Sequence, residues 1–359
     1  MNLWEWIADY ARRAHAANDR ERIQLVAMFQ HGSALRPRDP QAALTVFAQG
    51  ATLARMLDEP CWALLFDTWT GATYLHELDS IPRALEAANK NLVEGRKPAL
   101  MQCPVLGEMF ILATHTLYCM DVVGYAPRIQ EQLDYLENDV PIDDDTLCRV
   151  YDTRTEMTFE LKQLDRAHEL GLKYLELAQA HSAYQVDYAA CLLARSAFWR
   201  GDVEAALGFA EHGAHSGRRW FGASVQYLSQ AWVAALSQRL GRDEQARDAY
   251  RRALTQRDRP GFTTRAMYYD ALCLYLEERG DADQALAQRN QQLTEALPSE
   301  SPYYESSTRL RRVRLLGRMG LPHEAELDAL RAVLPRLLDS TLMQADMAHI
   351  EQGDFAERP

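Results

Sequence analysis

Few side chains in this sequence have the type and spacing that chemistry requires. His212 and His215 lie three residues apart, a spacing that could chelate a metal ion from one face of a helix, but no carboxylate or thiol motif joins them. Three aspartates, Asp143 to Asp145, precede an apolar segment without the other oxygen ligands of a calcium loop, so we expect them to cap a helix. The sequence therefore predicts no metal site and no cofactor.

Catalytic layouts are also missing. The glycine-rich nucleotide loops, the zinc-protease pair of histidines and the serine-hydrolase elbow do not occur. Nothing in the sequence pairs a nucleophile with a base, and we expect no enzymatic activity.

The densest group of basic residues offers two interpretations. Its members are Arg309, Arg311, Arg312, Arg314 and Arg318. On a helix, 311, 314 and 318 share one face. The first interpretation is a solvated outer surface paired with nearby glutamates (Glu305, Glu324 and Glu326). The second is a clamp for a carboxylate or phosphate, because the guanidinium fork binds such anions through two hydrogen bonds.

Composition and charge bound the class of protein. The 359 residues are 47% hydrophobic and 25% charged, the balance of an ordinary folded protein. The net charge is −12, and residues 1–217 carry most of the acidic excess, which disfavours nucleic acid and anionic membranes as partners. Six cysteines lie in apolar stretches without paired motifs, and no membrane span or signal peptide is evident, so we expect free thiols and a cytoplasmic protein.

An internal repeat dominates the chain. In four copies a glycine is followed five residues later by an alanine, which we call the anchor. Weaker copies continue the same spacing of anchors, which we call the repeat frame, toward the start of the chain. The anchor positions are Ala43, Ala84, Ile129, Ala167, Ala206, Ala246, Ala285 and Ala325. Their mean spacing is about 40 residues, in the range of helical repeat arrays.

Each period contains two amphipathic helical patterns. The glycine between them supplies the positive φ that ends one helix, and prolines close several units (Pro98, Pro141, Pro260 and Pro298). We predict an all-α fold: a right-handed α-solenoid of about eight antiparallel helical pairs over residues 20–338. Residues 1–19 form an N-terminal capping helix, and residues 339–359 form a C-terminal capping helix with a frayed tail. Pro335 should end or kink the last paired helix.

These features resemble the tetratricopeptide repeat (TPR) family. Ala246, Tyr250 and Ala253 match its second-helix pattern fully, and Ala43 with Phe47 matches it in part. Small residues twelve positions before the anchors match its first-helix contact position (Ala72, Ala194, Ala234 and Cys273). The period is longer than the family's 34 residues, and the first-helix Trp-Leu-Gly-Tyr pattern is largely absent. Long periods resemble the variants found in bacterial regulatory proteins.

The resemblance implies a ligand groove along the first helix of each pair. Carried onto this chain, the groove positions include Trp69, His76, Tyr118, Asp152, Glu156, Phe159, Arg195, Phe198, Asp270 and Arg314. Glu156 and Arg195 could grip a basic group and a carboxylate of a short peptide, or could pair with each other. We expect a protein- or peptide-binding adaptor or scaffold. The alternative is a ligand-sensing bacterial regulator, for a peptide or small metabolite, whose solenoid changes pitch on binding. Self-association is left open.

Overall fold

The computed structural model describes residues 2–215, 219–220, 223–255 and 262–358, so Pro260 lies outside the described residues. Within them the chain is almost entirely α-helical, which confirms the predicted all-α class. Apart from three short 3-10 turns, the exception is an antiparallel pair of two-residue strands, β1 (Arg219–Trp220) and β2 (Ala223–Ser224).

The chain folds into two compact units. Unit 1 comprises Met1–Met120 and Pro127–Val150, and unit 2 comprises Asp121–Ala126 and Tyr151–Pro359. Unit 1 contains α1 (Leu3–Ala16), α2 (Arg20–Leu35), α3 (Pro40–Met56), α4 (Pro60–His76), α5 (Ile81–Gly95) and η1 (Pro98–Leu100). Two helices have residues in both units, α6 (Leu106–Asp139) and α7 (Asp144–Glu160).

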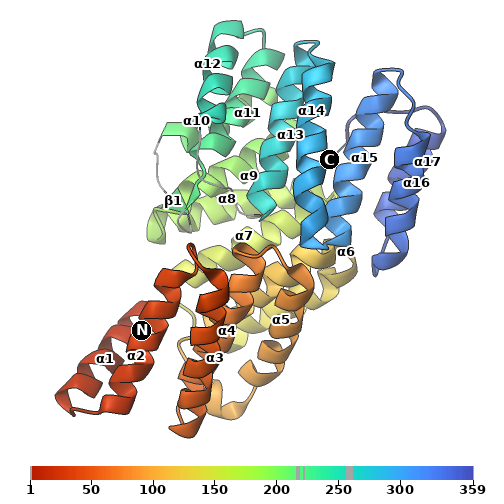
Figure 1. The fold of residues 1–359 in the computed structure, drawn as a ribbon. Helices are drawn as coiled ribbons and strands as arrows, with labels where there is room; N and C mark the ends of the chain where they lie inside the picture. Colours follow the sequence, from red (N-terminus) through yellow and green to blue (C-terminus); the bar gives the residue numbers. More distant parts are fainter. Residues whose placement is uncertain (1, 216–218, 221–222, 256–261, 359) are drawn as a thin grey trace. The chain divides into compact units, whose positions relative to one another are not determined.

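Unit 2 continues the same pattern. Its helices are α8 (Leu164–His181), α9 (Val186–Trp199), α10 (Val203–His215), α11 (Gln226–Arg239), α12 (Asp243–Leu254), α13 (Phe262–Glu278), α14 (Ala282–Ala296), η2 (Leu297–Ser299), α15 (Pro302–Arg318), α16 (Glu324–Val333), η3 (Leu334–Arg336) and α17 (Thr341–Glu351). In each unit, helices that follow one another in the chain pack side by side, from α1 to α5, from α8 to α12 and from α13 to α16 (Figure 1). First helices also meet, α9 with α11 and α11 with α13. This order of packing is consistent with a helical repeat.

The turn inside six of the eight pairs contains a residue with positive φ. Gly201, Gly241, Gly280 and Gly320 all have positive φ, between 67° and 89°, as the sequence predicts. Two weaker copies make the same turn without glycine, because Asp79 between α4 and α5 and Lys162 between α7 and α8 also adopt positive φ. Asn18 and Asp58 adopt positive φ too, but they lie in the connections before α2 and before α4, outside the pairs. Asparagine and aspartate tolerate this conformation through local hydrogen bonds, whereas lysine has no such compensation.

The repeat anchors lie at close helix contacts. Seven of the eight are 0 or 1% exposed. In six copies the anchor is the fourth residue of the second helix, as Ala246 is in α12. Ala325 is exposed, so the frame is wrong in the eighth pair. Helix α12 begins two residues after Gly241, but α16 begins four residues after Gly320; the two extra residues bring Leu327 to the buried position.

The third pair also departs from the frame. The sequence places a turn at Gly124, but Gly124 lies inside α6, and the helix is interrupted at Asp121 instead. A Cβ on Gly124 would lie 2.5 Å from the Asp121 carboxylate and from Leu338 Cβ, so glycine is required there for close approach. Among the described helices, α6 is long and apolar enough to cross a membrane by length and composition, and 67% of that stretch is buried within the protein.

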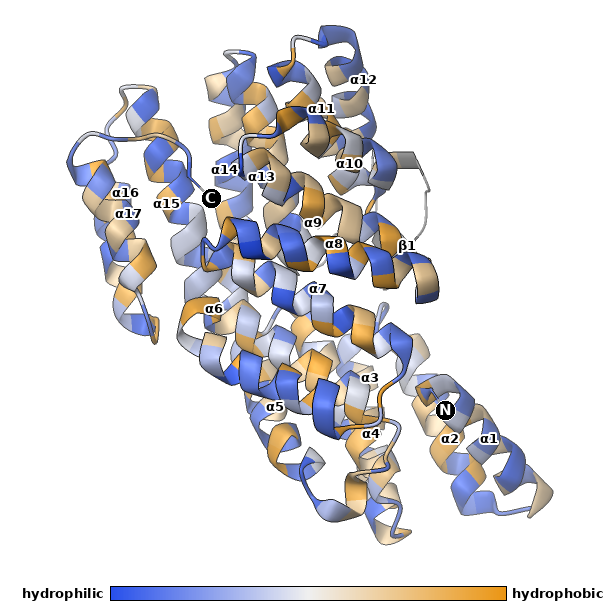
Figure 2. Ribbon diagram, turned by 180° about the vertical axis from the view of Figure 1, so that it is seen from behind, coloured by the Kyte–Doolittle hydropathy of each residue, from blue (hydrophilic) through white to orange (hydrophobic). Residues whose placement is uncertain are grey.

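Hydrophobic and hydrophilic residues alternate along individual helices, as expected for amphipathic helices (Figure 2). Helix α16 ends at Val333, two residues before Pro335, and α17 closes unit 2 over a core with Leu310, Val313, Leu330 and Met347. Asp143 accepts a hydrogen bond from the backbone N–H of Thr146 at 2.8 Å, the helix-capping role expected for it.

Candidate functional site

The predicted site residues of unit 1 fall into two aromatic clusters. Trp69 is 8% exposed, and its ring centroid lies 5.2 Å from that of Phe29 and 6.1 Å from that of Trp4, within the packing of α1, α2 and α4. His76 is exposed at the end of α4. The ring of His115 on α6 lies 5.9 Å from His76 and 6.2 Å from Tyr118, so the structure brings these two predicted residues together through a histidine that the sequence did not single out.

The remaining predicted residues belong to unit 2 and come from α7, α9, α13 and α15. Asp152, Glu156, Phe159, Arg195, Phe198 and Arg314 are each less than 9% exposed. The side chain of Asp270 is 15% exposed. Phe198 packs against Trp232 with ring centroids 5.8 Å apart. Charged groups are thus buried on all four helices.

Glu160 links three of these helices. Its Oε1 accepts a hydrogen bond from Arg195 Nη2 at 2.8 Å, and its Oε2 accepts one from the Tyr303 hydroxyl of α15. The Arg195 guanidinium also lies 3.7 Å from the centroid of the Phe159 ring, a cation–π contact. Burial alone would raise the pKa of Glu160, but the charges of Arg195 and Arg311 outweigh it and hold the pKa below its usual value. Glu160 is therefore an anion at neutral pH.

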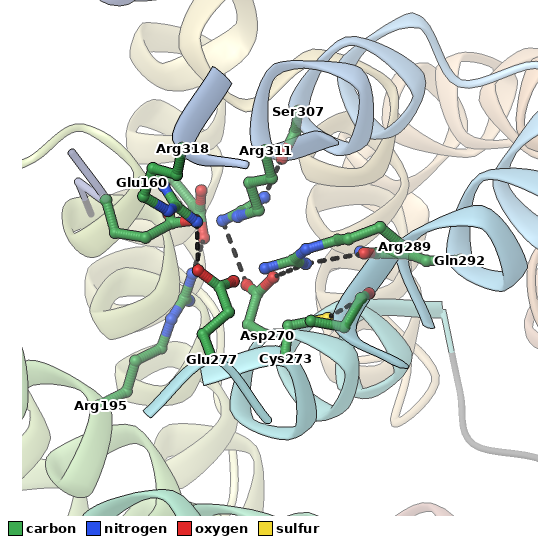
Figure 3. Close-up of polar contacts among 12 residues, drawn as sticks. Glu160, Arg195, Asp270, Cys273, Glu277, Arg289, Gln292, Ser307, Arg311 and Arg318 are labelled. Atoms are coloured by element: carbon green, nitrogen blue, oxygen red, sulfur yellow. Dashed lines mark hydrogen bonds and ion pairs between the residues drawn. The ribbon is translucent and has the colours of Figure 1, made fainter. Parts of the chain in front are cut away.

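Asp270 on α13 lies between two arginines (Figure 3). Arg289 Nη1 of α14 is 2.6 Å from Oδ1, and Arg311 Nη2 of α15 is 3.2 Å from Oδ2. Burial raises the pKa of this carboxyl, but Arg311 and Arg289 outweigh the effect and the pKa is lowered. We call Glu160, Arg195, Asp270, Arg289 and Arg311 the charged network.

The arginines of α15 divide between two sets of partners. Arg309 pairs with Glu305 and Glu326, and Arg312 pairs with Glu326, as the first interpretation expects, but their side chains are only 14% and 23% exposed. The face of 311, 314 and 318 has other partners. Their side chains are 14%, 1% and 27% exposed, and each pairs with a carboxylate from a different helix or from the tail. The anion-clamp interpretation remains a prediction for this face only.

Glu156 has a separate environment. It is 6% exposed and accepts a hydrogen bond from the Tyr188 hydroxyl of α9. Burial raises the pKa of Glu156 to about 7, against the opposing effects of Tyr188 and Arg195. Because that value lies near physiological pH, Glu156 is partly protonated there. The glutamate bonded to Arg195 at 2.8 Å is Glu160, one helical turn further along α7.

The sequence did not single out three residues that form these contacts, and the reasons are geometric. Glu160 lies seven residues before its anchor, one position away from the expected groove register. Tyr303 lies at the start of α15, in the pair whose frame is displaced. Arg289 belongs to a second helix and reaches the site through its long side chain. The density of arginine in the sequence was the one available signal.

Two cysteines lie on the first helices of unit 2. Burial raises the pKa of the Cys191 and Cys273 thiols to about 12, so both are protonated at neutral pH and are weak nucleophiles. Within the part of the chain that the structure describes, no three His, Cys, Asp or Glu side chains converge as a metal site would require.

Comparison with known proteins gives no family. No protein-family model matches this chain, and no curated protein matches its sequence.

Proposed function

We propose that this chain is a helical-repeat binding protein that holds a short peptide segment of a partner protein along the charged network. The supporting observation is that four helices of unit 2, together with α14, contribute buried charges to the same small region. Buried ion pairs contribute less to stability than well-packed apolar residues of similar volume, because both ions lose their hydration. A network of this kind is better accounted for by recognition of a charged ligand than by stability.

The resemblance to the TPR family supports the same proposal. The buried small anchors and the turns at positive φ agree with that resemblance, and we propose a right-handed, TPR-like solenoid acting as a cytoplasmic adaptor or scaffold. The peptide would carry groups of both signs, because Glu160 and Asp270 are anions beside Arg195, Arg289 and Arg311. Charged contacts would fix its register, while aromatic contacts contribute more of the affinity.

Arg311→Gln tests the proposal with little risk to the fold. Asp270 keeps its contact with Arg289 when Arg311 is lost. Arg312→Gln is the matched control, since it lies on the same helix and pairs with Glu326 and Asn290 on the other face. Peptides are selected from a displayed random library with the full chain, and their affinities are measured by fluorescence anisotropy. We expect Arg311→Gln to weaken binding at least about tenfold, the effect of losing one charged contact.

Arg312→Gln should leave the affinity within about twofold, as is usual for a charge at the rim of an interface. Melting temperatures of both variants, followed by circular dichroism, exclude a folding defect. Equal affinities for the wild type and Arg311→Gln would place the peptide elsewhere, and a library that yields no binder would count against the function itself.

A further inference from the structure

Beside the charged network, unit 2 contains a cavity of about 540 Å³ including its opening to solvent. It lies against α15 and α17, and the segment before α17 completes it. Four cationic side chains reach it: Lys162, Arg311, Arg314 and Arg358.

Some hydrogen-bond donors of this cavity have no acceptor. Arg314 is 1% exposed, and its Nε has no hydrogen-bond partner among the described residues; the Nε of Arg358 is in the same condition. The carboxylates are already engaged. Asp346 lies 2.8 Å from Arg314 Nη2 and 2.7 Å from Lys162 Nζ, and Asp339 accepts the backbone N–H of Thr341 at 2.8 Å. The unmatched groups are N–H donors, which call for an anion.

Lys162 adds an independent observation. Its φ is +60°, in a turn where five other copies use glycine or aspartate. Glycine would adopt this conformation at lower energy. What lysine provides at this position is an ammonium group that reaches Asp346 at the cavity. Non-glycine residues held at positive φ occur preferentially at binding sites.

Charge and polarity define the class of ligand. The lining contains four cations and the three carboxylates of Glu160, Asp339 and Asp346. Asp270 and Asp354, outside the lining, also pair with Arg311 and Arg358, so a singly charged anion suits the site better than a doubly charged one. A planar carboxylate also matches the fork of a guanidinium. Apolar side chains, including Leu310, Leu342 and Met343, form another part of the wall.

We propose that this cavity binds a monocarboxylate on a short apolar chain, with the carboxylate held by Arg314 and Arg358. The carboxylate could belong to a free acid or to the end of a peptide chain. Glu160 and Arg311 belong both to the charged network and to this lining. The carboxylate is held by Arg314 and Arg358, which lie outside the network, so the inference does not depend on the proposed function.

Isothermal titration of the full chain with hexanoate tests the site directly. We expect a dissociation constant below roughly 1 mM. Hexanol, which keeps the chain but lacks the charge, should bind at least about tenfold more weakly, and hexyl phosphate should also bind more weakly because of its second charge. N-acetyl-Ala-Leu as the free acid and as the amide separates the two sources: tighter binding of the peptide acid than of hexanoate assigns the site to a chain end, and the reverse assigns it to a free acid.

Two variants and one control connect the binding to the named residues. Arg314→Met should reduce hexanoate affinity at least tenfold, and Arg358→Gln, in the tail, should reduce it several-fold without touching the core. Arg331→Gln, on α16 with its side chain 47% exposed, should have no effect. If Arg314→Met fails to fold, the tail variant still decides the matter. Hexanol binding as tightly as hexanoate, or Arg358→Gln binding like the wild type, would overturn the proposal.

Discussion

Glu156 is the residue whose charge state couples most directly to stability. Its pKa is raised to about 7 by burial, above the ordinary value of 4.5, so the folded protein favours the protonated carboxyl. A group with a raised pKa contributes stability that is fully present below its unfolded pKa, here about pH 4.5, and is lost as pH rises through about 7. Above pH 7 the folded state must hold a buried carboxylate.

Replacing Glu156 by glutamine removes this titration and keeps an acceptor for the Tyr188 hydroxyl. We compare the free energy of unfolding of Glu156→Gln with that of the wild type at each pH. The difference should shift in favour of the variant by roughly 3 kcal/mol between pH 4.5 and pH 8. Urea unfolding at both pH values measures it. Glu204→Gln, with a side chain 65% exposed, is the control and should show little change with pH. A pH-independent effect of Glu156→Gln would mean that Glu156 is ionised throughout.

For the charged residues of unit 2, the sequence predicts which helices they lie on better than it predicts which residues they contact. The resemblance to the TPR family implies that Arg195, Asp270 and Arg314 lie on first helices and face the groove, and the structure places all three on first helices. The sequence cannot indicate that Arg195 bonds Glu160 at 2.8 Å with Glu156 one turn away, because that choice depends on side-chain reach and on how neighbouring helices pack. Local periodicity does not contain this information.

Among the helices, the anchors and turns were predictable and the exceptions have local causes. A small residue five positions after a turn glycine becomes buried when the second helix starts two residues after the glycine. Two additional residues before α16 move the buried position from Ala325 to Leu327. The long helix α6 is interrupted at Asp121, three residues before Gly124, where the sequence pattern places the turn. Turn length is the quantity that the repeat pattern alone does not specify.

Gly317 on α15 controls how the tail packs. Residues 353–358, for which the sequence predicts fraying, lie along α15 in the structure: Arg318 Nη1 donates to the Phe355 carbonyl at 2.7 Å, and the Glu357 carboxylate lies 2.9 Å from Arg318 Nη2. A Cβ on Gly317 would lie 2.2 Å from the Phe355 ring. Gly317→Ala should therefore displace the tail while leaving α15 intact, because alanine favours the helix.

Gly208→Ala is the matched control for this variant. Gly208 is exposed within α10, and a Cβ there would contact nothing within 4 Å. This change should stabilise the protein by roughly 0.5–1 kcal/mol. Hydrogen exchange measured by mass spectrometry should show faster exchange of 353–358 in Gly317→Ala alone. Unchanged tail exchange in Gly317→Ala would mean that Phe355 moves aside without releasing the tail.

At the scale of the whole chain, packing in sequence order makes stability a local property. Within each unit a helix meets mainly its neighbours in the chain, so a defect should spread only to adjacent repeats. Hydrogen exchange can resolve this, because it reports the free energy of opening segment by segment.

Ala246→Arg places a defect at one defined point of the array. Ala246 is 0% exposed in α12, which packs on α11, so the substitution overpacks the contact and buries an unpaired charge, at a cost of roughly 3–5 kcal/mol. We expect the amides of α10 to α13 to exchange much faster, while those of α3 and α4 in unit 1 keep their protection. Arg251→Ala, with its side chain 74% exposed, should change neither set. Equal loss of protection in unit 1 and unit 2 would show that the chain unfolds as one cooperative domain, because a nearest-neighbour array cannot transmit a single defect over that many helices without attenuation.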